Sequence, residues 1–179
     1  DGEFLGYVYT KMVRRTLLNQ HHITFLEGAS MGEDFLWVAR ILCRAERVGY
    51  TPKQSYFWRT TPGSLLRDDL PAARLRRIHS YIMVIEELFR LADRESLPVA
   101  RLLNRLAEDQ GRILLSKIAE IGSLRQRSLL SHHLRKSGFL GRLSRRVEDV
   151  GHWKRILRAY GFSWLGALFP DDTKIVKKT

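Results

Sequence analysis

The spacing of apolar residues predicts helices along most of the chain from Pro71 onward. A first stripe recurs every three or four positions and predicts one helix: Leu75, Ile78, Ile82, Ile85 and Phe89. A second stripe predicts another helix, or a broken one, from near Pro98 to Gly122: Val99, Leu102, Leu106, Ile113 and Ile118. A third helix is expected to close at Gly161: Val147, Val150, Trp153, Leu157 and Tyr160. Because such stripes are packing surfaces, they indicate a small helical bundle or a set of helices appended to the first part of the chain.

The first third of the chain has a mixed pattern. The segment 4–18, FLGYVYTKMVRRTLL, predicts a short strand that runs into a helical turn, and ITFLEG at 23–28 predicts a short extended piece. From Asp34 to Ala45 the apolar residues recur at helical spacing, and Gly49 is expected to end that helix. QSYFWRT at 54–60 predicts a strand and TPGS at 61–64 a loop. The expected fold is therefore mostly α with a small β portion (α+β), divided into residues 1–69 and 70–179.

Charge and cysteine content narrow the possible partners and the compartment. The 179 residues include 31 Lys and Arg against 19 Asp and Glu, a net charge of +12, which favours phosphorylated ligands, an anionic membrane face or nucleic acid. The single cysteine, Cys43, excludes an internal disulfide framework and fits a reducing compartment. No apolar run is long enough to cross a bilayer, and the start of the chain lacks the layout of a signal peptide. We expect a cytoplasmic protein that can lie on the inner face of the membrane.

Two adjacent carboxylates, Glu33 and Asp34, stand at the expected start of a helix. Acidic residues there complement the positive end of the helix dipole, and Asp is a favoured cap, so a capping role is one interpretation. The preceding loop contains only small residues around Met31, so a ligand can approach the carboxylates closely: Gly28, Ala29, Ser30 and Gly32. A carboxylate that is held rigidly yet is accessible suits a general base, which is the second interpretation.

The order of several short motifs adds a resemblance to a known family. Lys11 precedes a basic pair at 14–15, and Phe-Leu-Glu-Gly follows at 25–28. Gly-Glu-Asp stands at 32–34, RVGY at 47–50, and the aromatic run 56–59 ends in Arg59 and is followed by Ser64. This ordered set resembles the carboxyl-terminal half of the catalytic domain of family-two glycosyltransferases, which are inverting enzymes with the GT-A fold. The resemblance covers roughly the first 65 residues.

The resemblance implies a role for each matching residue. Asp34 would be the base that accepts the proton of the acceptor sugar's hydroxyl, and Glu33 would support it or bind the acceptor. Gly32, Lys11, Arg59 and Ser64 would contact substrates, the last two beside the diphosphate of a nucleotide sugar. A solvated strand end is the alternative for Arg59. The implied activity is inverting sugar transfer from a nucleotide sugar to an acceptor glycan or lipid-linked sugar, in bacterial surface polysaccharide synthesis.

One part of the family pattern has no counterpart in this chain. Family members begin with a nucleotide-binding half that carries an Asp-x-Asp metal motif after a strand. The acidic pairs 68–69 and 171–172 do not follow apolar strands and suit helix starts or turns. We therefore expect a fragment that holds no cofactor itself, whereas Mg²⁺ or Mn²⁺ would accompany the donor in the complete enzyme. Tyr9 stands where the family commonly has Trp. His21 and His22 have no other His, Cys or Asp at metal-ligand spacing, so no metal site is expected.

The last part of the chain is basic and rich in aromatic residues. Residues 135–169 mix Arg and Lys with Phe, Leu and Trp, a composition typical of a segment on an anionic membrane surface. A packed bundle with a solvated basic face is the alternative. Nucleic acid is disfavoured as a partner because no reader motif is recognised. The alternative function is accordingly a non-catalytic basic helical module that binds an anionic membrane or nucleic acid.

Overall fold

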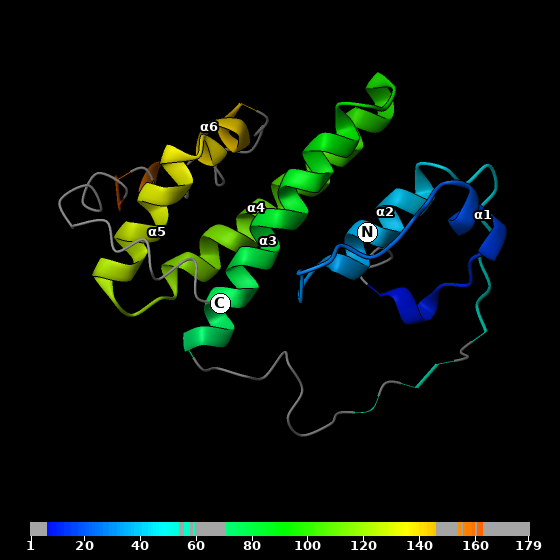
Figure 1. The fold of residues 1–179 in the computed structure, drawn as a ribbon, viewed down its shortest axis with the longest axis horizontal. Coiled ribbons are helices and arrows are strands. Elements are labelled where there is room, and N and C mark those ends of the chain that lie inside the picture. Colours follow the sequence, from blue (N-terminus) through cyan, green and yellow to red (C-terminus); the bar gives the residue numbers. More distant parts are fainter. Residues whose placement is uncertain are drawn as a thin grey trace. The chain divides into compact units, whose positions relative to one another are not determined.

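The computed structural model describes residues 7–53, 56, 57, 59, 71–145, 154, 156–159, 161 and 162. Within these residues the regular structure is helical throughout (Figure 1). The elements in chain order are a short 3-10 helix, η2 (Val8–Thr10), followed by α1 (Arg15–Gln20), α2 (Glu33–Leu42), α3 (Pro71–Ala92), α4 (Leu97–Ala119), α5 (Leu124–Lys136) and α6 (Phe139–Ser144). The mostly α class expected from the sequence is confirmed.

The chain divides into two compact units, Asp1–Leu103 and Asn104–Thr179, so that α4 contributes residues to both. The boundary expected from the sequence, between residues 69 and 70, falls outside the described residues.

The small β portion expected from the sequence is not found in the described residues. Val8–Thr10 forms a 3-10 helix in place of a strand, Ile23–Leu26 has no regular structure, and Tyr56, Phe57 and Arg59 are not in a strand. A strand is stabilised by hydrogen bonds to a neighbouring strand, and no described segment provides such a neighbour. Extended-type composition alone therefore does not yield a sheet here.

Helix α2 is the buried centre of the first unit. Residues from Phe35 to Ala39 are all buried, and so is Ile41. A helix that is apolar on every side requires packing partners on more than one side. Trp37, Val38 and Ile41 pack with Ile23, and partly buried side chains surround this cluster: Val8, Val13, Leu17 and Leu18. Helix α3 contacts α2 as well, so α2 is held between the amino-terminal segment and α3.

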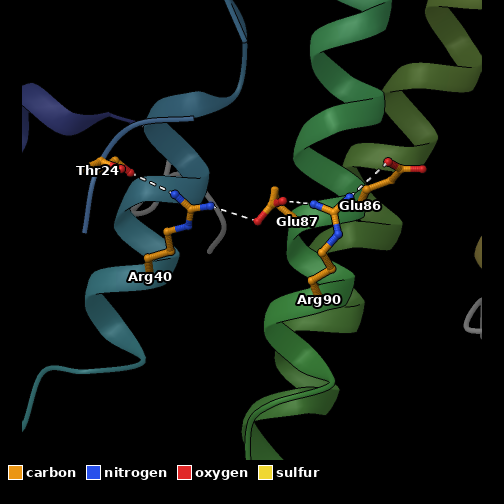
Figure 2. A network of polar contacts seen from close by, with 5 residues as sticks. All are labelled: Thr24, Arg40, Glu86, Glu87 and Arg90. Carbon is orange, nitrogen blue, oxygen red and sulfur yellow. Dashed lines mark hydrogen bonds and ion pairs between the residues drawn. The ribbon is translucent and has the colours of Figure 1, made fainter. Parts of the chain in front are cut away.

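Polar contacts also join α2 to α3. The Arg40 guanidinium donates to the carbonyl oxygen of Thr24 at 3.0 Å and to Oε2 of Glu87 on α3 at 3.0 Å (Figure 2). Glu87 also accepts from Arg90, whose guanidinium lies 3.7 Å from Oε2 of Glu86. Burial lowers the pKa of Arg40, yet the group stays charged because its usual pKa is so high. The network fixes the rotation of α2 against α3.

Helix α2 ends earlier than the sequence indicated. It stops at Leu42, whereas Gly49 was the expected end. Leu42 is 37% exposed and Val48 is 63% exposed, so beyond Ile41 there is no apolar face to bury. Without that burial, helix formation gains little, and the chain leaves the helix through a turn at Cys43 and Arg44.

The two long helices confirm the predicted segments but differ in which residues face inward. In α3 the predicted Ile78, Ile85 and Phe89 are buried. In α4, which is unbroken, Leu103 is 3% exposed while the predicted Leu102 is 62% exposed. A shift by one residue in the opposite direction occurs near the end of the chain, where Ile156 is buried and the predicted Leu157 is 61% exposed. Each pair places two apolar residues side by side, and spacing alone does not distinguish between them.

Most of the third predicted stripe lies outside the described residues. Residues 156–159, 161 and 162 are helical, so in the described part the helix continues through Gly161, which was its expected end.

The second unit has an apolar core of its own. Helices α5 and α6 are joined by a turn at Gly138, whose φ of +74° suits glycine. Their fully buried residues are Leu134, Phe139, Leu140 and Leu143. Ser123 caps α5 by accepting from the backbone N–H of Gln126 at 3.3 Å. The sequence pattern did not predict α5, because polar and basic residues interrupt its apolar positions.

Candidate functional site

The two carboxylates occupy the first turn of α2. Gly32 is the amino-terminal cap residue, with a φ of +79° and no capping side chain, so Glu33 and Asp34 are the first two helical residues. Asp34 is therefore not the cap residue itself. Both carboxylates still lie in the first turn of the helix, at the positive end of its dipole.

The loop before α2 is anchored to α3. The backbone N–H of Ser30 donates to Oγ of Ser80 at 2.9 Å, and this hydroxyl in turn donates to the carbonyl oxygen of Arg76 at 3.0 Å. Ser80 is only 1% exposed. At Gly32 an added Cβ would lie 3.4 Å from Cγ2 of Val84, which shows how closely the loop backbone approaches α3. The carboxylates are thus carried by a fixed turn and a buried helix.

Glu33 and Asp34 have different surroundings. Oε2 of Glu33 is buried and has no hydrogen-bond partner in the described part of the chain. Burial raises the pKa of Glu33; a hydrogen bond with its own backbone opposes this rise, and the neighbouring charge of Asp34 adds to it. Asp34 is partly exposed. Adjacent carboxylates in unlike environments can divide their roles, with the more solvated one accepting a proton and the buried one tending to keep its own.

Three tyrosines form an aromatic stack next to this turn. The ring centroids of Tyr9 and Tyr56 are 4.2 Å apart with an interplanar angle of 22°, and those of Tyr7 and Tyr9 are 5.2 Å apart at 29°. Helix η2, which contains Tyr9, contacts α2. Desolvation and the two tyrosine neighbours raise the pKa of Tyr9, and the charge of Asp34 contributes to the same rise. The stack therefore lies within electrostatic range of the candidate base.

The tyrosine rings keep accessible surface. Tyr7 is 51% exposed, Tyr9 39% and Tyr56 49%. Sequence reasoning noted Tyr9 but missed the stack, because Tyr56 is far away in sequence and nothing in the spacing connects the two. Ser80 was missed for the same reason.

The predicted substrate-binding residues are only partly brought together. Lys11 is next to the stack: its ammonium donates to the carbonyl oxygen of Tyr7 at 3.0 Å and to Oγ1 of Thr10 at 2.6 Å. Desolvation lowers the pKa of Lys11. Gly32 forms the turn before the carboxylates, as expected. Arg59 is exposed, and Ser64 lies outside the described residues.

An open hollow extends from the tyrosine stack. It has a volume of about 1430 Å³ and lies between residues of the amino-terminal segment 7–21 and residues of the range 38–53 together with Tyr56. Tyr9, Tyr56 and Lys11 all line it. The hollow and the stack thus form one candidate site within the first unit, and η2, which carries Tyr9, contacts the helix that bears the carboxylates. Glu33 and Asp34 are not among the residues that line the hollow.

Histidine and cysteine side chains are further potentially reactive groups among the described residues. In the part of the chain that the structure describes, no group of three or more His, Cys, Asp and Glu side chains could hold a metal ion. His21 and His22 are exposed. Burial raises the pKa of the Cys43 thiol, and Glu95 adds to this rise while Arg44 opposes it, so the thiolate is disfavoured.

Among the described helices, none combines the length and the apolar character needed to cross a membrane. Comparison of the chain with protein-family models, with curated proteins and with solved structures finds no match.

Proposed function

We propose that this chain is the acceptor-side part of an inverting glycosyltransferase with Asp34 as the general base. The observation that supports this most is the position of Asp34: partly exposed, on the first turn of a buried helix, and within electrostatic range of a stack of exposed tyrosine rings. The resemblance of the ordered motifs from Lys11 to Ser64 to those of family-two glycosyltransferases supports the proposed family. We further propose that the enzyme works at the cytoplasmic face of the membrane in bacterial surface polysaccharide synthesis.

In the proposed reaction an acceptor hydroxyl attacks the anomeric carbon of a nucleotide sugar. The new C–O bond forms as the bond from that carbon to the diphosphate oxygen breaks, which inverts the anomeric configuration. The hydroxyl proton passes to Asp34, and a nucleoside diphosphate leaves. A positioned general base contributes about 10²–10⁴-fold to the rate of such a step. Glu33, the adjacent carboxylate on the same turn, would bind the acceptor or hold Asp34 in place.

The donor would be held chiefly by residues of the complete protein that precede this chain. Those residues would also bind the Mg²⁺ or Mn²⁺ that offsets the charge of the diphosphate. Arg59, which is exposed, and Ser64 would face the same diphosphate from the acceptor side.

The class of reaction is tested with the complete protein encoded by the gene. It is incubated with a panel of UDP-, GDP- and dTDP-sugars, with and without a membrane extract of the source cells as acceptor, and nucleoside diphosphate release is measured. We expect acceptor-dependent release with one donor and a product of inverted anomeric configuration by NMR. If no donor is consumed and the upstream reading frame contains no apolar strand with an Asp-x-Asp motif, the proposal is wrong.

A second candidate function is supported by the charge of α5 and α6. Residues 121–145 contain no acidic residue, whereas Arg125, Arg127, Arg135, Lys136, Arg142 and Arg145 are basic. Leu124 is 49% exposed beside Arg125, and apolar and basic groups side by side suit the surface of an anionic membrane.

Flotation with vesicles distinguishes this second function. We expect the chain to float with vesicles that contain phosphatidylglycerol, and to be released at raised salt because the attraction is electrostatic. Equal flotation with neutral vesicles, or preferential binding to an oligonucleotide in competition, would exclude an anionic membrane as the partner.

A further inference from the structure

The hollow at the tyrosine stack has a strongly basic lining. Arg14, Arg47 and Lys53 line it together with Lys11, and Glu46 is the acidic residue among the lining side chains. Arg44 also lines it but is paired with Glu95 at 2.7 Å, which offsets its charge. The potential inside the hollow is therefore positive, and a concave basic surface concentrates anions.

Three of these cations have no ion-pair partner among the residues that the structure describes. Arg14, Arg47 and Lys53 are exposed and form no ion pair within the described residues. They come from two separate segments, one before α1 and one after α2. Because both segments face the same hollow, their charges can act on one ligand.

The same hollow ends in the tyrosine stack. Tyr9 and Tyr56 line it, and their rings are stacked at 4.2 Å with part of each surface exposed. Flat aromatic faces pack against the apolar C–H face of a sugar ring, and they contribute binding through contact area that charge does not provide. The hollow thus combines a surface for a ring with a set of cations for an anion.

We propose that this hollow binds an acceptor that is a saccharide carrying a phosphate or diphosphate group. The sugar ring lies on Tyr9 and Tyr56, and the phosphate oxygens accept hydrogen bonds from Arg47, Lys53 and Arg14. This assignment rests on the proposed glycosyltransferase function and specifies its acceptor class. A lipid-linked sugar diphosphate and a soluble sugar phosphate share this chemistry.

Direct binding to the full chain tests the proposal. The probes are glucose 1-phosphate, glucose and inorganic pyrophosphate, with affinity measured by calorimetry at low and raised salt. We expect glucose 1-phosphate to bind at least about tenfold more tightly than glucose, because charge-assisted hydrogen bonds to phosphate contribute this much or more. Equal affinities for the two sugars would overturn the proposal.

Variants separate the two parts of the site. The double substitution Arg47→Gln and Lys53→Gln is expected to weaken both glucose 1-phosphate and pyrophosphate about tenfold. The matched control, Arg101→Gln with Arg105→Gln, removes the same charge from exposed positions of α4 and should leave both affinities unchanged. An equal loss in the control would show a general effect of net charge and would overturn the assignment of the site.

Tyr56→Ala tests the surface for the ring. It is expected to weaken glucose 1-phosphate about fivefold or more, by analogy with other ring-on-aromatic contacts, and to leave pyrophosphate unchanged. Loss of both affinities, or of neither, would contradict the placement of the sugar on the tyrosines. Tighter binding of a single-stranded oligonucleotide than of the sugar phosphate would also overturn the proposal, because cations and exposed rings can serve that ligand.

A final binding experiment distinguishes a lipid-linked acceptor from a soluble one. A short-chain polyprenyl diphosphate sugar that binds more tightly than the matching sugar diphosphate indicates a lipid-linked acceptor, and equal affinity indicates a soluble one; either result supports the phosphate assignment. An error in the acceptor class can be distinguished from an error in the proposed function. If Asp34→Asn abolishes transfer by the complete enzyme while sugar phosphates do not bind, the acceptor class is wrong and the base assignment stands.

Discussion

Replacement of Gly32 by alanine tests whether the turn before α2 is under the constraint that its geometry implies. Gly32 has a φ of +79°, a left-handed conformation that L-residues with a Cβ adopt at a cost of about 1–2 kcal/mol. The new methyl group would lie 3.4 Å from Cγ2 of Val84, an ordinary contact, so strain in the backbone is the main term. Alanine also stiffens the unfolded chain, which offsets about 0.4–1 kcal/mol. The net loss of unfolding free energy is about 1 kcal/mol.

Urea denaturation followed by circular dichroism measures this loss. With a slope of about 2 kcal/mol per molar urea, a typical value, the midpoint should fall by about 0.5 M. The matched control is Gly49→Ala: φ at Gly49 is outside the left-handed region, and an added Cβ there would meet nothing within 4 Å. This control is expected to keep or slightly raise the midpoint, because only the unfolded-state effect remains.

Two outcomes would refute the reasoning about this turn. Equal midpoints for Gly32→Ala and the wild type would show that the turn does not require a left-handed residue. An equal loss in Gly32→Ala and Gly49→Ala would show that the cost does not come from backbone geometry. Gly32→Asn adds a further check, because asparagine tolerates the left-handed region and should lose less stability than alanine.

Three further experiments test the packing and the electrostatics of the first unit. Leu36→Ala removes a side chain with no exposed surface and should cost about 2–5 kcal/mol of unfolding free energy, whereas Leu124→Ala, at a site 49% exposed, should stay within about 0.5 kcal/mol. A double-mutant cycle of Arg40→Gln and Glu87→Gln should give a coupling of at least about 0.5 kcal/mol that shrinks at raised salt, and a coupling of zero would contradict the network. The raised pKa of Glu33 means that the folded state binds its proton more tightly, so this group lowers stability as pH rises from the ordinary glutamate pKa through the raised one. Relative to the wild type, Glu33→Gln should therefore be more favourable at pH 7 than at pH 4; the opposite trend in urea titrations would contradict the burial of that carboxylate.

The sequence predicted the helices better than it predicted their inward faces. Leu102 and Leu103, or Leu157 and Ile156, stand next to each other, and a periodic pattern fits either choice. The structure buries Leu103 and Ile156, because packing partners distant in sequence decide which residue of each pair faces inward. The helix α5 was missed because its buried positions include Ser128 and Ser131, which do not register as apolar.

The candidate site was predicted only where its residues are contiguous in sequence. Gly32, Glu33 and Asp34 form one motif, and they occupy the turn and the first helical residues as a unit. The tyrosine stack and the Ser30–Ser80 hydrogen bond join positions about 50 residues apart, and no local rule connects them. The expected strands were wrong in the described residues because aromatic and β-branched content favours extended structure only when a partner strand is available.

The most direct test of the account is the Asp34→Asn variant of the complete enzyme in the acceptor-dependent release of nucleoside diphosphate. Asparagine keeps the size of the side chain but cannot accept the proton, so turnover should fall by about 10²-fold or more while the helix content and the affinity for the nucleotide sugar stay unchanged. Asp109→Asn, at an exposed salt bridge on α4, is the matched control and should keep full activity. Wild-type turnover by Asp34→Asn would contradict the central claim that this carboxylate accepts the acceptor's proton.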